Sequence, residues 1–418
     1  MAGNALVEVL EVSVESAAGE SALAGTGIDV PEPGASRPTF DLEIRGWAIG
    51  RRSAAVAIEV AHDDLVIGTA PLEVARPKLA ARHPATAAGD RIGFRVQLGL
   101  LRVPAEFDFS VRALTEDGER EPIGRLHGRR AEIHTGFEPR FQPLMLTTLG
   151  RTGSMMLMQM LEAHPEILVY RPFRYEQRVA SYWLEVLIAL SEPASYFRQI
   201  APAGSLDERR WWLGEDGVTP TGLRDEQLQH WLGAGAVREL AEVSQLRVER
   251  LYEQLADRLE RDSAPGFFAE KYALDISHLV RELYPGAREV FLVRDFRDMV
   301  SSIIAFNEKR GAAGFGRGAA ASDLEYVRSL GAWATRLEEA YARRSDGAIV
   351  VRYEDLVLDP GPTLKRLLEH IGVESSDEVV GRMVEALAGE LAELAEHRTT
   401  ADPRASIGVG GETSGRSS

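Results

Sequence analysis

The sequence predicts two domains, an all-β sandwich followed by a larger α/β domain in which a parallel sheet lies between two layers of helices. Its 418 residues exceed the usual size of a single hydrophobic core. From about residue 39 to residue 132, short segments of alternating apolar and polar residues are separated by turn residues, a pattern typical of antiparallel strands. After residue 143 the pattern changes to near-continuous apolar runs, each followed by a helical pattern. Such runs are typical of parallel strands buried on both faces.

The composition is that of an ordinary globular protein, and it limits the possible functions. Hydrophobic residues make up 44% and charged residues 27% of the chain, which is too apolar for a largely disordered protein. The net charge of -16 argues against a broad nucleic-acid surface, so we expect any anion site to be local. The chain has no cysteine, which excludes disulfides, thiolate metal sites and cysteine nucleophiles. We find no signal peptide and no run of roughly 20 apolar residues, so we expect no transmembrane segment and a cytoplasmic location.

The first domain is expected between residues 38 and 135. Residues 1–37 are expected to form a flexible N-terminal segment, because residues 19–37 are rich in Gly, Ala, Ser and Pro and lack periodicity. The alternating segments that follow predict a β-sandwich. Its "GWA" and "GF" turns are similar to those of β-sandwich modules found beside bacterial carbohydrate-modifying enzymes.

The second domain is expected between residues 140 and 400, with residues 401–418 as a flexible tail. Its predicted strands are "LMLTTL", "REVFLVR" and "AIVVRYEDL", and a mostly helical insertion is expected around residues 176–263. A further helix is predicted to begin at a capping box formed by Ser322 and Glu325. Its apolar face is predicted to contain Leu324, Val327, Leu330, Leu337 and Tyr341.

The first of these strands runs into the turn Gly150-Arg151-Thr152-Gly153-Ser154 and then directly into a helix. A strand, a glycine turn and a helix N-terminus form an anion site, because unpaired N–H groups and the positive end of the helix dipole converge there. The nucleotide-hydrolase version of this turn, G-x-x-x-x-G-K-[ST], does not fit. With its second glycine at Gly153, Thr148 replaces the first glycine and Ser154 replaces the lysine. The cation of the turn is Arg151 instead, and Ser154 is also a candidate helix cap.

Two other strands end in arginine. "FLVRDFRD" places Arg294 at the end of its strand, and "IVVRYEDL" places Arg352 there. Nucleotide hydrolases commonly carry an aspartate at such a position, where it holds Mg²⁺. Arginine favours a site in which side-chain cations, and not a metal, bind the anion. The sequence therefore predicts a P-loop-like α/β domain with a metal-free phosphate site.

The first turn resembles the 5′-phosphosulfate loop of the sulfotransferases that use 3′-phosphoadenosine-5′-phosphosulfate (PAPS). Bacterial and Golgi members of that family carry an R-S-G-[ST]-[ST] core, followed by a helix and an H-P pair. Here the core reads Arg151-Thr152-Gly153-Ser154-Met155, and His164-Pro165 follows the helix. Met155 stands where family members carry a hydroxyl residue.

The second turn is similar to the 3′-phosphate motif of the same family, R-D-P-R-D followed by serine. In that motif the leading arginine and a serine eight positions later bind the 3′-phosphate. These positions are Arg294 and Ser302, and Phe296 replaces the proline. The C-terminal "ASIGVGGE" resembles the family's "SIGRW", with Val409 in place of the basic residue. The likeness covers roughly residues 143–375.

The resemblance implies a PAPS-dependent sulfotransferase that moves a sulfuryl group to a hydroxyl of an unknown acceptor, a carbohydrate or another small or cell-envelope molecule. It implies that Arg151 and the amides after Gly153 bind the 5′-phosphosulfate. Arg294 and Ser302 would bind the 3′-phosphate, and Lys271 would assist at the transferring sulfuryl group. We expect no metal in this site.

Sulfuryl transfer to a hydroxyl also needs a base that accepts the hydroxyl proton. Cytosolic members of the family use a histidine two residues after a lysine, but Ala273 stands two residues after Lys271. Other members use a glutamate shortly after the H-P pair, which makes Glu176 our first candidate. Glu270 and His278 are the alternatives.

Several features have two interpretations that the sequence leaves open. Arg171 and Arg174 either contact an anionic acceptor or lie in solvent. Residues 309–320, "KRGAAGFGRGAA", either close over the nucleotide or form an inert linker. His164 is expected to be structural. Tryptophans of the insertion either stack on a flat acceptor or, as we favour, pack in the core; they are Trp211, Trp212 and Trp231.

Two other functions are kept as alternatives. A P-loop small-molecule kinase would bind ATP with Mg²⁺, although the lysine after the second glycine is missing. A non-catalytic nucleotide- or carbohydrate-binding protein would use the β-sandwich for recognition and retain a degenerate enzyme domain. The departures at Met155 and Val409 are compatible with that second alternative.

Overall fold

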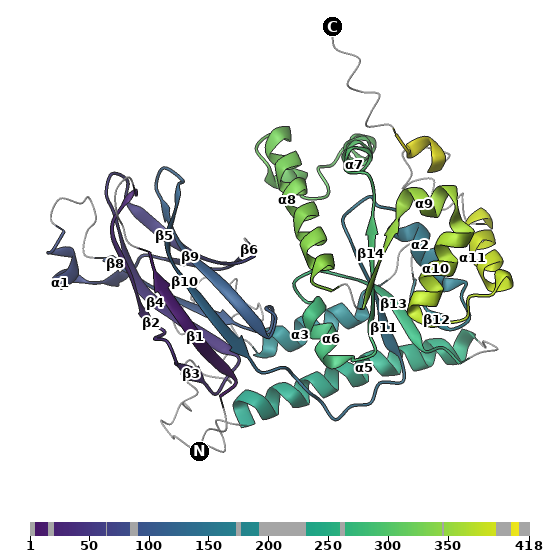
Figure 1. Ribbon diagram of the computed structural model, residues 1–418, viewed down its shortest axis with the longest axis horizontal. Coiled ribbons are helices and arrows are strands. Elements are labelled where there is room, and N and C mark those ends of the chain that lie inside the picture. Colours follow the sequence, from purple (N-terminus) through teal and green to yellow (C-terminus); the bar gives the residue numbers. More distant parts are fainter. Residues whose placement is uncertain are drawn as a thin grey trace, which may run out of the picture. The chain divides into compact units, whose positions relative to one another are not determined.

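The computed structural model describes residues 5–15, 21–63, 65–83, 91–172, 177–191, 231–259, 264–344, 347–389 and 403–408. The chain divides into two compact units, one within residues 1–136 and 184–244 and the other within residues 137–183 and 245–418. Among the described residues, no helix has both the length and the apolar character to cross a membrane. The predicted fold classes are both found: an all-β unit and an α/β unit (Figure 1).

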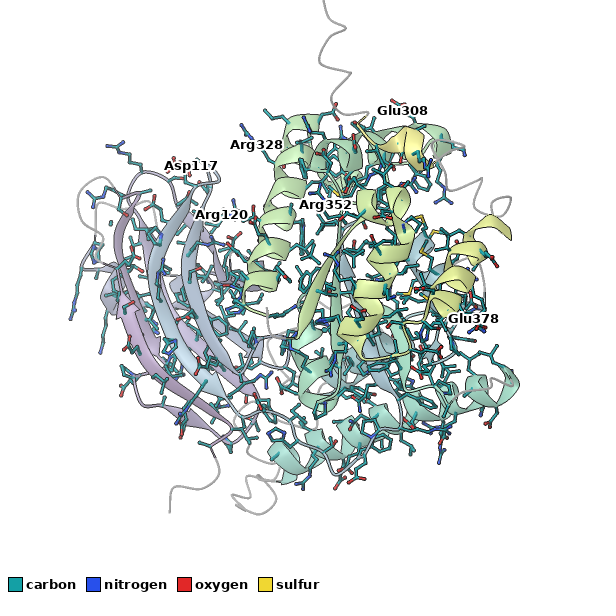
Figure 2. All side chains as sticks on the ribbon, turned by 45° about the vertical axis from the view of Figure 1, so that its right-hand side comes forward. Asp117, Arg120, Glu308, Arg328, Arg352 and Glu378 are labelled. Atoms are coloured by element: carbon teal, nitrogen blue, oxygen red, sulfur yellow. The ribbon has the colours of Figure 1, made fainter. Side chains whose placement is uncertain are left out.

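The described part of the first unit contains two antiparallel sheets. Their strand orders are β3-β1-β10-β9-β5-β6 and β2-β4-β8-β7. The two sheets share one hydrophobic core, to which β4 contributes Leu42 and Ile44. Charged side chains such as Asp117 and Arg120 lie at the turn between β9 and β10 (Figure 2). This is the predicted β-sandwich. Its strands are β1 (Val7–Val14), β2 (Leu23–Val30), β3 (Ser36–Arg37), β4 (Asp41–Gly50), β5 (Ala55–His62), β6 (Leu65–Pro71), β7 (Val74–Ala75), β8 (Arg91–Gly99), β9 (Glu106–Thr115) and β10 (Arg120–Arg130), with the short helix α1 (Pro77–Ala80) after β7.

Strands β1, β2 and β3 lie within residues 1–37, so the prediction of a flexible N-terminal segment is wrong for the described residues of that range. Val7 and Val9 of β1 are buried in the sandwich core. The sequence of β2, "LAGTGIDV", has little apolar periodicity because its glycines make room for a neighbour. A Cβ atom at Gly27 would overlap the indole ring of Trp47, which lies opposite on β4. Because glycines occupy the positions next to this ring, the sequence of β2 lacks the alternating pattern by which a strand is predicted.

The second unit is built on a parallel sheet whose described strands have the order β12-β13-β11-β14-β15. The strand that precedes the first arginine turn, β11, lies at the centre of the sheet. Its direct neighbour β14 carries the second arginine turn at its end. The strands are β11 (Gln142–Thr148), β12 (Ile167–Leu168), β13 (Phe267–Tyr272), β14 (Arg288–Val293) and β15 (Ala348–Arg352).

Helices cover both faces of this sheet, as predicted (Figure 1). On one face α2, α10 and α11 share a core with Leu144 and Leu146 of β11. On the other face α8 packs against Phe291, and α5 stacks Tyr252 on Phe268 with ring centroids 4.3 Å apart. The helices are α2 (Ser154–Glu162), α3 (Val179–Ser191), α5 (Ala236–Leu259), α6 (Ser277–Leu283), α7 (Phe296–Arg310), α8 (Asp323–Ala342), α9 (Tyr353–Leu358), α10 (Pro360–Ile371) and α11 (Asp377–Gly389).

Helix α8 begins as the sequence predicts, but its buried face contains Tyr326 in place of the predicted Leu324. The Ser322 side chain accepts a hydrogen bond from the Glu325 amide at 3.2 Å, as in a capping box. Leu330 and Leu337 are buried, whereas Leu324 is 61% exposed and Tyr326 is buried instead. Leu324 was therefore wrongly assigned to the apolar face. It occupies the first turn, where the chain still enters the helix.

The helical insertion is only partly described, and it does not belong wholly to the α/β unit. Its described segments are α3, the π-helix η2 (Trp231–Gly235) and α5, while residues 192–230 and 260–263 lie outside the described residues. The described residues among 184–244 group with the first compact unit, whereas the sequence analysis places this stretch in the α/β domain. A Cβ atom at Gly233 would overlap the carbonyl oxygen of Pro38, so backbone packs directly on backbone there. Such a contact has no signature in the sequence.

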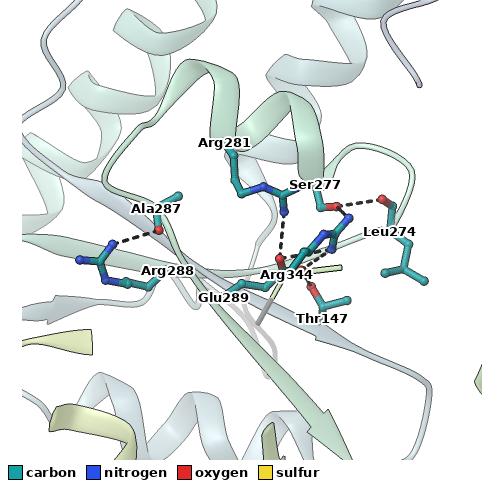
Figure 3. A network of polar contacts seen from close by, with 8 residues as sticks. All are labelled: Thr147, Leu274, Ser277, Arg281, Ala287, Arg288, Glu289 and Arg344. Carbon is teal, nitrogen blue, oxygen red and sulfur yellow. Dashed lines mark hydrogen bonds and ion pairs between the residues drawn. The ribbon is translucent and has the colours of Figure 1, made fainter. Parts of the chain in front are cut away.

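A buried carboxylate ties several elements of the second unit together (Figure 3). Glu289 of β14 is 3% exposed and accepts a hydrogen bond from the Thr147 hydroxyl at 2.6 Å. Its carboxylate also pairs with Arg281 of α6 at 3.0 Å and with Arg344, beyond the end of α8, at 2.9 Å. Arg344 in turn donates to the Ser277 hydroxyl at 2.6 Å. This network holds β11, β14, α6 and the end of α8 in register.

Replacing Glu289 by alanine is expected to lower the free energy of unfolding by about 3–5 kcal/mol, because two arginines would lose their buried counter-charge. Urea unfolding of the full chain measures the change. The control is Glu308→Ala, which removes an exposed carboxylate of α7 (Figure 2) and should change stability by less than about 0.5 kcal/mol. Equal losses in the two variants would contradict the stabilising role of the network.

Candidate active site

The first arginine turn, between β11 and α2, has a backbone that requires glycine. Arg151 and Gly153 both adopt left-handed conformations, with φ angles of 64° and 89°. A Cβ atom at Gly153 would also overlap the ring of Tyr353. Gly153 is the N-cap residue of α2 and Ser154 is its first helical residue, so Ser154 is not the helix cap that the sequence suggested. The glycine is therefore needed twice, for its conformation and for the close approach of the tyrosine ring.

Hydrogen bonds from two threonine hydroxyls to backbone carbonyls stabilise this turn. Thr152 is 2% exposed, and its hydroxyl donates to the Leu149 carbonyl at 3.0 Å and contacts the hydroxyl of Thr148. Thr148 donates to the carbonyl of Leu292 on β14 at 2.7 Å. Because its side chain is used within the turn, Thr152 can offer a ligand its backbone N–H group.

The N-terminus of α2 follows the turn directly. The first hydrogen bond of the helix joins the Leu157 amide to the Gly153 carbonyl at 3.1 Å. The amides of the residues between them have no acceptor within the helix, as at every helix start, and they point out of its end. Two of these residues, Ser154 and Met155, belong to the predicted anion-binding set and are half-buried. Backbone donors and the positive end of the helix dipole thus meet at this turn.

The second arginine turn repeats the arrangement of strand, turn and helix. Arg294 follows β14, and Asp295 caps α7 by accepting hydrogen bonds from the amides of Arg297 at 3.0 Å and Asp298 at 3.4 Å. Phe296 is the first residue of α7, the position at which proline is well tolerated in helices. The exchange of the family's proline for Phe296 therefore leaves the helix start intact.

The two arginine turns lie against each other, although 143 residues separate them in the chain. One guanidinium nitrogen of Arg294, Nη1, donates to the Arg151 carbonyl at 3.0 Å. The Arg151 Nε donates to the Ser302 hydroxyl of α7 at 3.2 Å. The structure thus brings together Arg151, Arg294 and Ser302, three of the residues that the sequence singled out.

Two half-buried positive charges converge here, and the electrostatics are those of an anion site. Burial and the nearby charge of Arg294 lower the pKa of Arg151. Each guanidinium lies over an aromatic ring at 4.5 Å from its centroid, Arg151 over Phe306 and Arg294 over Tyr353. The Nε atom of Arg294 is buried and has no hydrogen-bond partner within the described part of the chain. A bound phosphate group would relieve both the repulsion and the missing hydrogen bond.

The segment 309–320, which the sequence left as either a cover for the nucleotide or an inert linker, contacts the first turn. A Cβ atom at Gly150 would overlap the ring of Phe315, so this ring packs on the backbone of the turn. Phe315 has a left-handed φ of 57° and is 42% exposed. The Asn307 side chain fixes the segment by accepting from the Gly314 amide at 3.0 Å and donating to its carbonyl at 3.3 Å. The segment is therefore a structured wall beside the turn.

A short C-terminal segment, the 3-10 helix η5 (Pro403–Ser406), lies on the second turn. The Arg294 Nη2 donates to the carbonyl of Ser406 at 2.7 Å, and the Ser406 hydroxyl lies 3.1 Å from the Tyr353 hydroxyl. The Gly408 amide donates to Asp298 at 2.7 Å. The prediction of a flexible tail over residues 401–418 is thus wrong for residues 403–408, because their polar groups bond to the site.

Lys271 and Glu270 are neighbours on β13 but face opposite sides of the sheet. Lys271 lies beside Leu146 of β11, close to the carboxyl end of the strand. Glu270 is fully buried and accepts hydrogen bonds from the Tyr252 hydroxyl at 2.7 Å and the Val179 amide at 2.9 Å. Burial raises the pKa of Glu270 to about 7. Glu270 therefore fastens the start of α3 and does not lie at the arginine turns.

The two histidines considered earlier are also held away from the arginine turns. The Nδ1 atom of His164 accepts from the Glu166 amide at 3.1 Å, so its Nε2 carries the proton and donates to the Glu374 carbonyl at 2.8 Å. Both nitrogens of this buried ring are thus used within the fold. His278 is 7% exposed on α6, on the face of the sheet opposite α2.

The remaining candidate residues are less informative. Glu176 and Arg174 lie outside the described residues, as do Val409, Trp211 and Trp212 and the side chain of Trp231. Arg171 forms an ion pair with Glu162 at the end of α2. Arg352 ends β15 as predicted, but it is exposed and lies 3.6 Å from Glu354 (Figure 2). Its guanidinium is therefore not part of the contact between Arg151 and Arg294.

Sequence reasoning missed three residues that shape this site: Phe315, Tyr353 and Ser406. Phe315 lies in a run of glycines whose φ angles were not predictable from their spacing. Tyr353 follows the third predicted strand, and nothing in the sequence indicates that its ring packs on Gly153. Ser406 was assigned to a flexible segment.

Comparison with known proteins adds an independent finding. Residues 143–377 match the model of the "Sulfotransferase family". Similar solved structures include sulfotransferase STF9 from Mycobacterium avium, with 16% identity, 60% of this chain and 69% of that chain covered, and a TM-score of 0.30. The sulfotransferase domain from the curacin biosynthetic pathway has 17% identity, covering 57% of this chain and 77% of that chain, with a TM-score of 0.33. Mouse sulfotransferase SULT7A1 complexed with PAP has 12% identity, covering 62% and 67%, with a TM-score of 0.27. Because these TM-scores are low, only the family match, which spans more than half of the chain, carries weight.

The raised pKa of Glu270 gives a testable pH dependence. An acid whose pKa is about 7 when folded and 4.5 when unfolded binds more protons in the folded state between these values, so its contribution to stability falls as the pH rises through that window. Relative to Glu270→Gln, the wild type should lose about 1.5 kcal/mol of stability between pH 5.5 and 7. Urea unfolding of both proteins across this range measures the difference. Parallel curves would show that Glu270 does not titrate there.

Proposed function

The chain belongs to the sulfotransferase family, and we propose that it moves the sulfuryl group of PAPS to a hydroxyl group of an acceptor. The single observation that carries this proposal is the meeting of the two arginine turns, in which Arg294 donates to the carbonyl of Arg151 at 3.0 Å. Two cations and a helix N-terminus at one place suit a ligand with two separate anionic groups. PAPS is such a ligand.

At the first turn, Arg151 and the amides at the start of α2 would bind the 5′-phosphosulfate. In the reaction, the sulfur–oxygen bond to the phosphate breaks as a new sulfur–oxygen bond to the acceptor forms, and 3′,5′-adenosine bisphosphate is released. Negative charge then grows on the departing phosphate oxygen. Donors that are already in place stabilise such a charge without reorganising. Arg151 is fixed by Ser302 and by the ring of Phe306, so it meets this requirement.

At the second turn, Arg294 and Ser302 would bind the 3′-phosphate. The buried Nε of Arg294, which has no partner among the described residues, fits a site built for an anion. Its Nη atoms already bond to the carbonyls of Arg151 and Ser406, which set the plane of the guanidinium. This end would hold the donor in position for transfer at the other end.

The acceptor proton needs a base, and Glu176 is our proposal. Of the two alternatives, Glu270 is fully buried and bonded to the start of α3, and His278 is buried on α6, on the face of the sheet opposite α2, so neither competes well for this role. Lys271 lies on the strand next to β11, near its carboxyl end, and would assist at the transferring group. The acceptor is a small molecule or glycan that carries a hydroxyl, and we propose that no metal takes part.

Arg151→Ala and Arg294→Ala should have different effects. Arg151→Ala should lower turnover at least about 10²-fold, because it removes a donor to the departing phosphate. Arg294→Ala should weaken binding of 3′,5′-adenosine bisphosphate about tenfold to a hundredfold, the loss expected for hydrogen bonds to a charged group. Labelled-sulfate transfer and calorimetry measure the two effects. The matched control is Arg328→Ala, which removes an exposed arginine of α8 (Figure 2) and should change neither.

The same calorimeter separates this proposal from a P-loop kinase. We expect the bisphosphate to bind equally well with magnesium and with EDTA, and ATP–Mg²⁺ to bind more weakly. Tight binding of ATP that depends on Mg²⁺ would favour the kinase. Unchanged bisphosphate binding in both arginine variants would remove the basis of the sulfotransferase assignment to these turns.

A further inference from the structure

Phe315 has a backbone conformation that phenylalanine rarely adopts. Its φ angle of 57° lies in the left-handed region, where a bulky side chain is strained. Among the described residues of the second unit, Arg151 is the other non-glycine residue with a positive φ angle. Glycines stand on both sides of Phe315 in the sequence, and glycine at position 315 would take the same angle without strain. Retained strain of this kind clusters at functional sites, so the phenylalanine ring needs an explanation.

The segment around Phe315 is held in place by bonds that do not involve its ring. Asn307 of α7 accepts from the Gly314 amide at 3.0 Å and donates to the Gly314 carbonyl at 3.3 Å. The carbonyl of Phe315 accepts from the Tyr326 hydroxyl of α8 at 3.0 Å. These bonds would remain with another residue at position 315. The fixed backbone therefore presents whichever side chain stands there to the first turn.

The ring lies at one end of the Arg151 guanidinium group. Along α7, Arg151 contacts two residues that are one helical turn apart: its Nε donates to the Ser302 hydroxyl at 3.2 Å, and its guanidinium carbon lies 4.5 Å from the ring centroid of Phe306. The Phe315 ring meets the Phe306 ring edge-on, with centroids 5.7 Å apart, and packs on the backbone of Gly150. Phe315 is thus at the Phe306 end of the guanidinium group, and Ser302 is at the other end.

This order determines which part of a bound donor would approach the ring. Ser302 is the proposed ligand of the 3′-phosphate, and Arg151 is the proposed ligand of the 5′-phosphosulfate. A donor that runs from Ser302 along Arg151 would bring its sulfuryl end towards Phe315. The ring is 42% exposed, so part of its surface is available to border that group.

Water competes with any acceptor for this sulfuryl group. In hydrolysis the sulfur–oxygen bond to the phosphate breaks and a sulfur–oxygen bond to water forms, so that sulfate, 3′,5′-adenosine bisphosphate and a proton are released. The donors at Arg151 and the start of α2 would stabilise the departing phosphate in this reaction as well, because the leaving group is the same. Selection against water therefore needs a group that excludes it from the sulfuryl side. An aromatic ring suits this task, because it offers water no hydrogen bond comparable to that of a polar group.

We propose that Phe315 excludes water from the transferring sulfuryl group, and that it thereby determines transfer to the acceptor over hydrolysis of the donor. The inference rests on the proposed function, since it concerns the same sulfuryl group. It also explains the strained backbone. Glycine at position 315 would relieve the strain, but it would leave the sulfuryl group open to water.

Release of labelled sulfate from PAPS, without an added acceptor, tests the inference on the full chain. Phe315→Gly should raise the rate of release about tenfold over the wild type, because glycine keeps the backbone conformation and admits water. Phe315→Leu keeps an apolar side chain and should stay within about twofold of the wild-type rate. The matched control is Asp63→Gly, which removes a residue with a φ angle of 47° from the β-sandwich and should leave the rate unchanged. Calorimetry should show equal affinity of all these proteins for 3′,5′-adenosine bisphosphate.

A purely structural role of the ring predicts a different result. Phe315→Gly would then lower the rate of sulfate release or leave it unchanged, and either outcome would overturn the inference. A clear loss of bisphosphate affinity in Phe315→Gly would also overturn it, because the ring would then contact the nucleotide itself. Faster release that persists in the double variant Arg151→Ala/Phe315→Gly would do the same, because hydrolysis would not take place at the first turn. Failure of the bisphosphate to bind the wild type would instead contradict the proposed function.

Discussion

The hydrogen bond from the Arg294 guanidinium to the Arg151 carbonyl is the contact on which the rest of the site depends. It places two like charges side by side in a half-buried position, where burial, and then repulsion by Arg294, lower the pKa of Arg151. Proteins seldom keep such a pair without an anionic partner. The aromatic rings of Phe306 and Tyr353, whose centroids each lie 4.5 Å from a guanidinium carbon, stabilise the two cations by cation–π contacts.

The order of the strands makes this contact possible. Strands β11 and β14 are direct neighbours and run parallel, so the turns that follow them leave the sheet at the same edge. The buried Glu289 of β14 bonds to Thr147 of β11 and pairs with two arginines, and these contacts also fix the register of the two strands. Register errors would displace the two turns relative to each other. The chemistry at the carboxyl ends is thus supported by a network deeper in the sheet.

Much of this site could be predicted from the sequence, because its central features are local. The spacing of Arg151 and Gly153 before a helix, and of Arg294 and Ser302 around another, defines each turn without knowledge of the other. What the sequence could not supply are contacts between distant segments. The packing of Phe315 and Tyr353 on turn glycines, and the bond from Arg294 to Ser406, depend on tertiary structure alone.

In the fold, too, local patterns were predictable from the sequence and contacts between distant segments were not. Apolar runs predicted the parallel strands β11, β14 and β15, and alternation predicted most of the β-sandwich. Strand β2 was missed because glycines occupy the positions that lie against the ring of Trp47, so its sequence has little apolar alternation. A cavity of about 280 Å³ beside α8, whose walls include Phe291, Ala334 and Leu337, was also beyond the sequence, because its walls come from segments far apart in the chain.

The most direct test of the whole account is a crystal structure of the chain with 3′,5′-adenosine bisphosphate. We expect the 5′-phosphate within hydrogen-bond distance of Arg151 and the amides at the start of α2, and the 3′-phosphate on Arg294 and Ser302. A bisphosphate bound elsewhere, or by only one of the two turns, would contradict it.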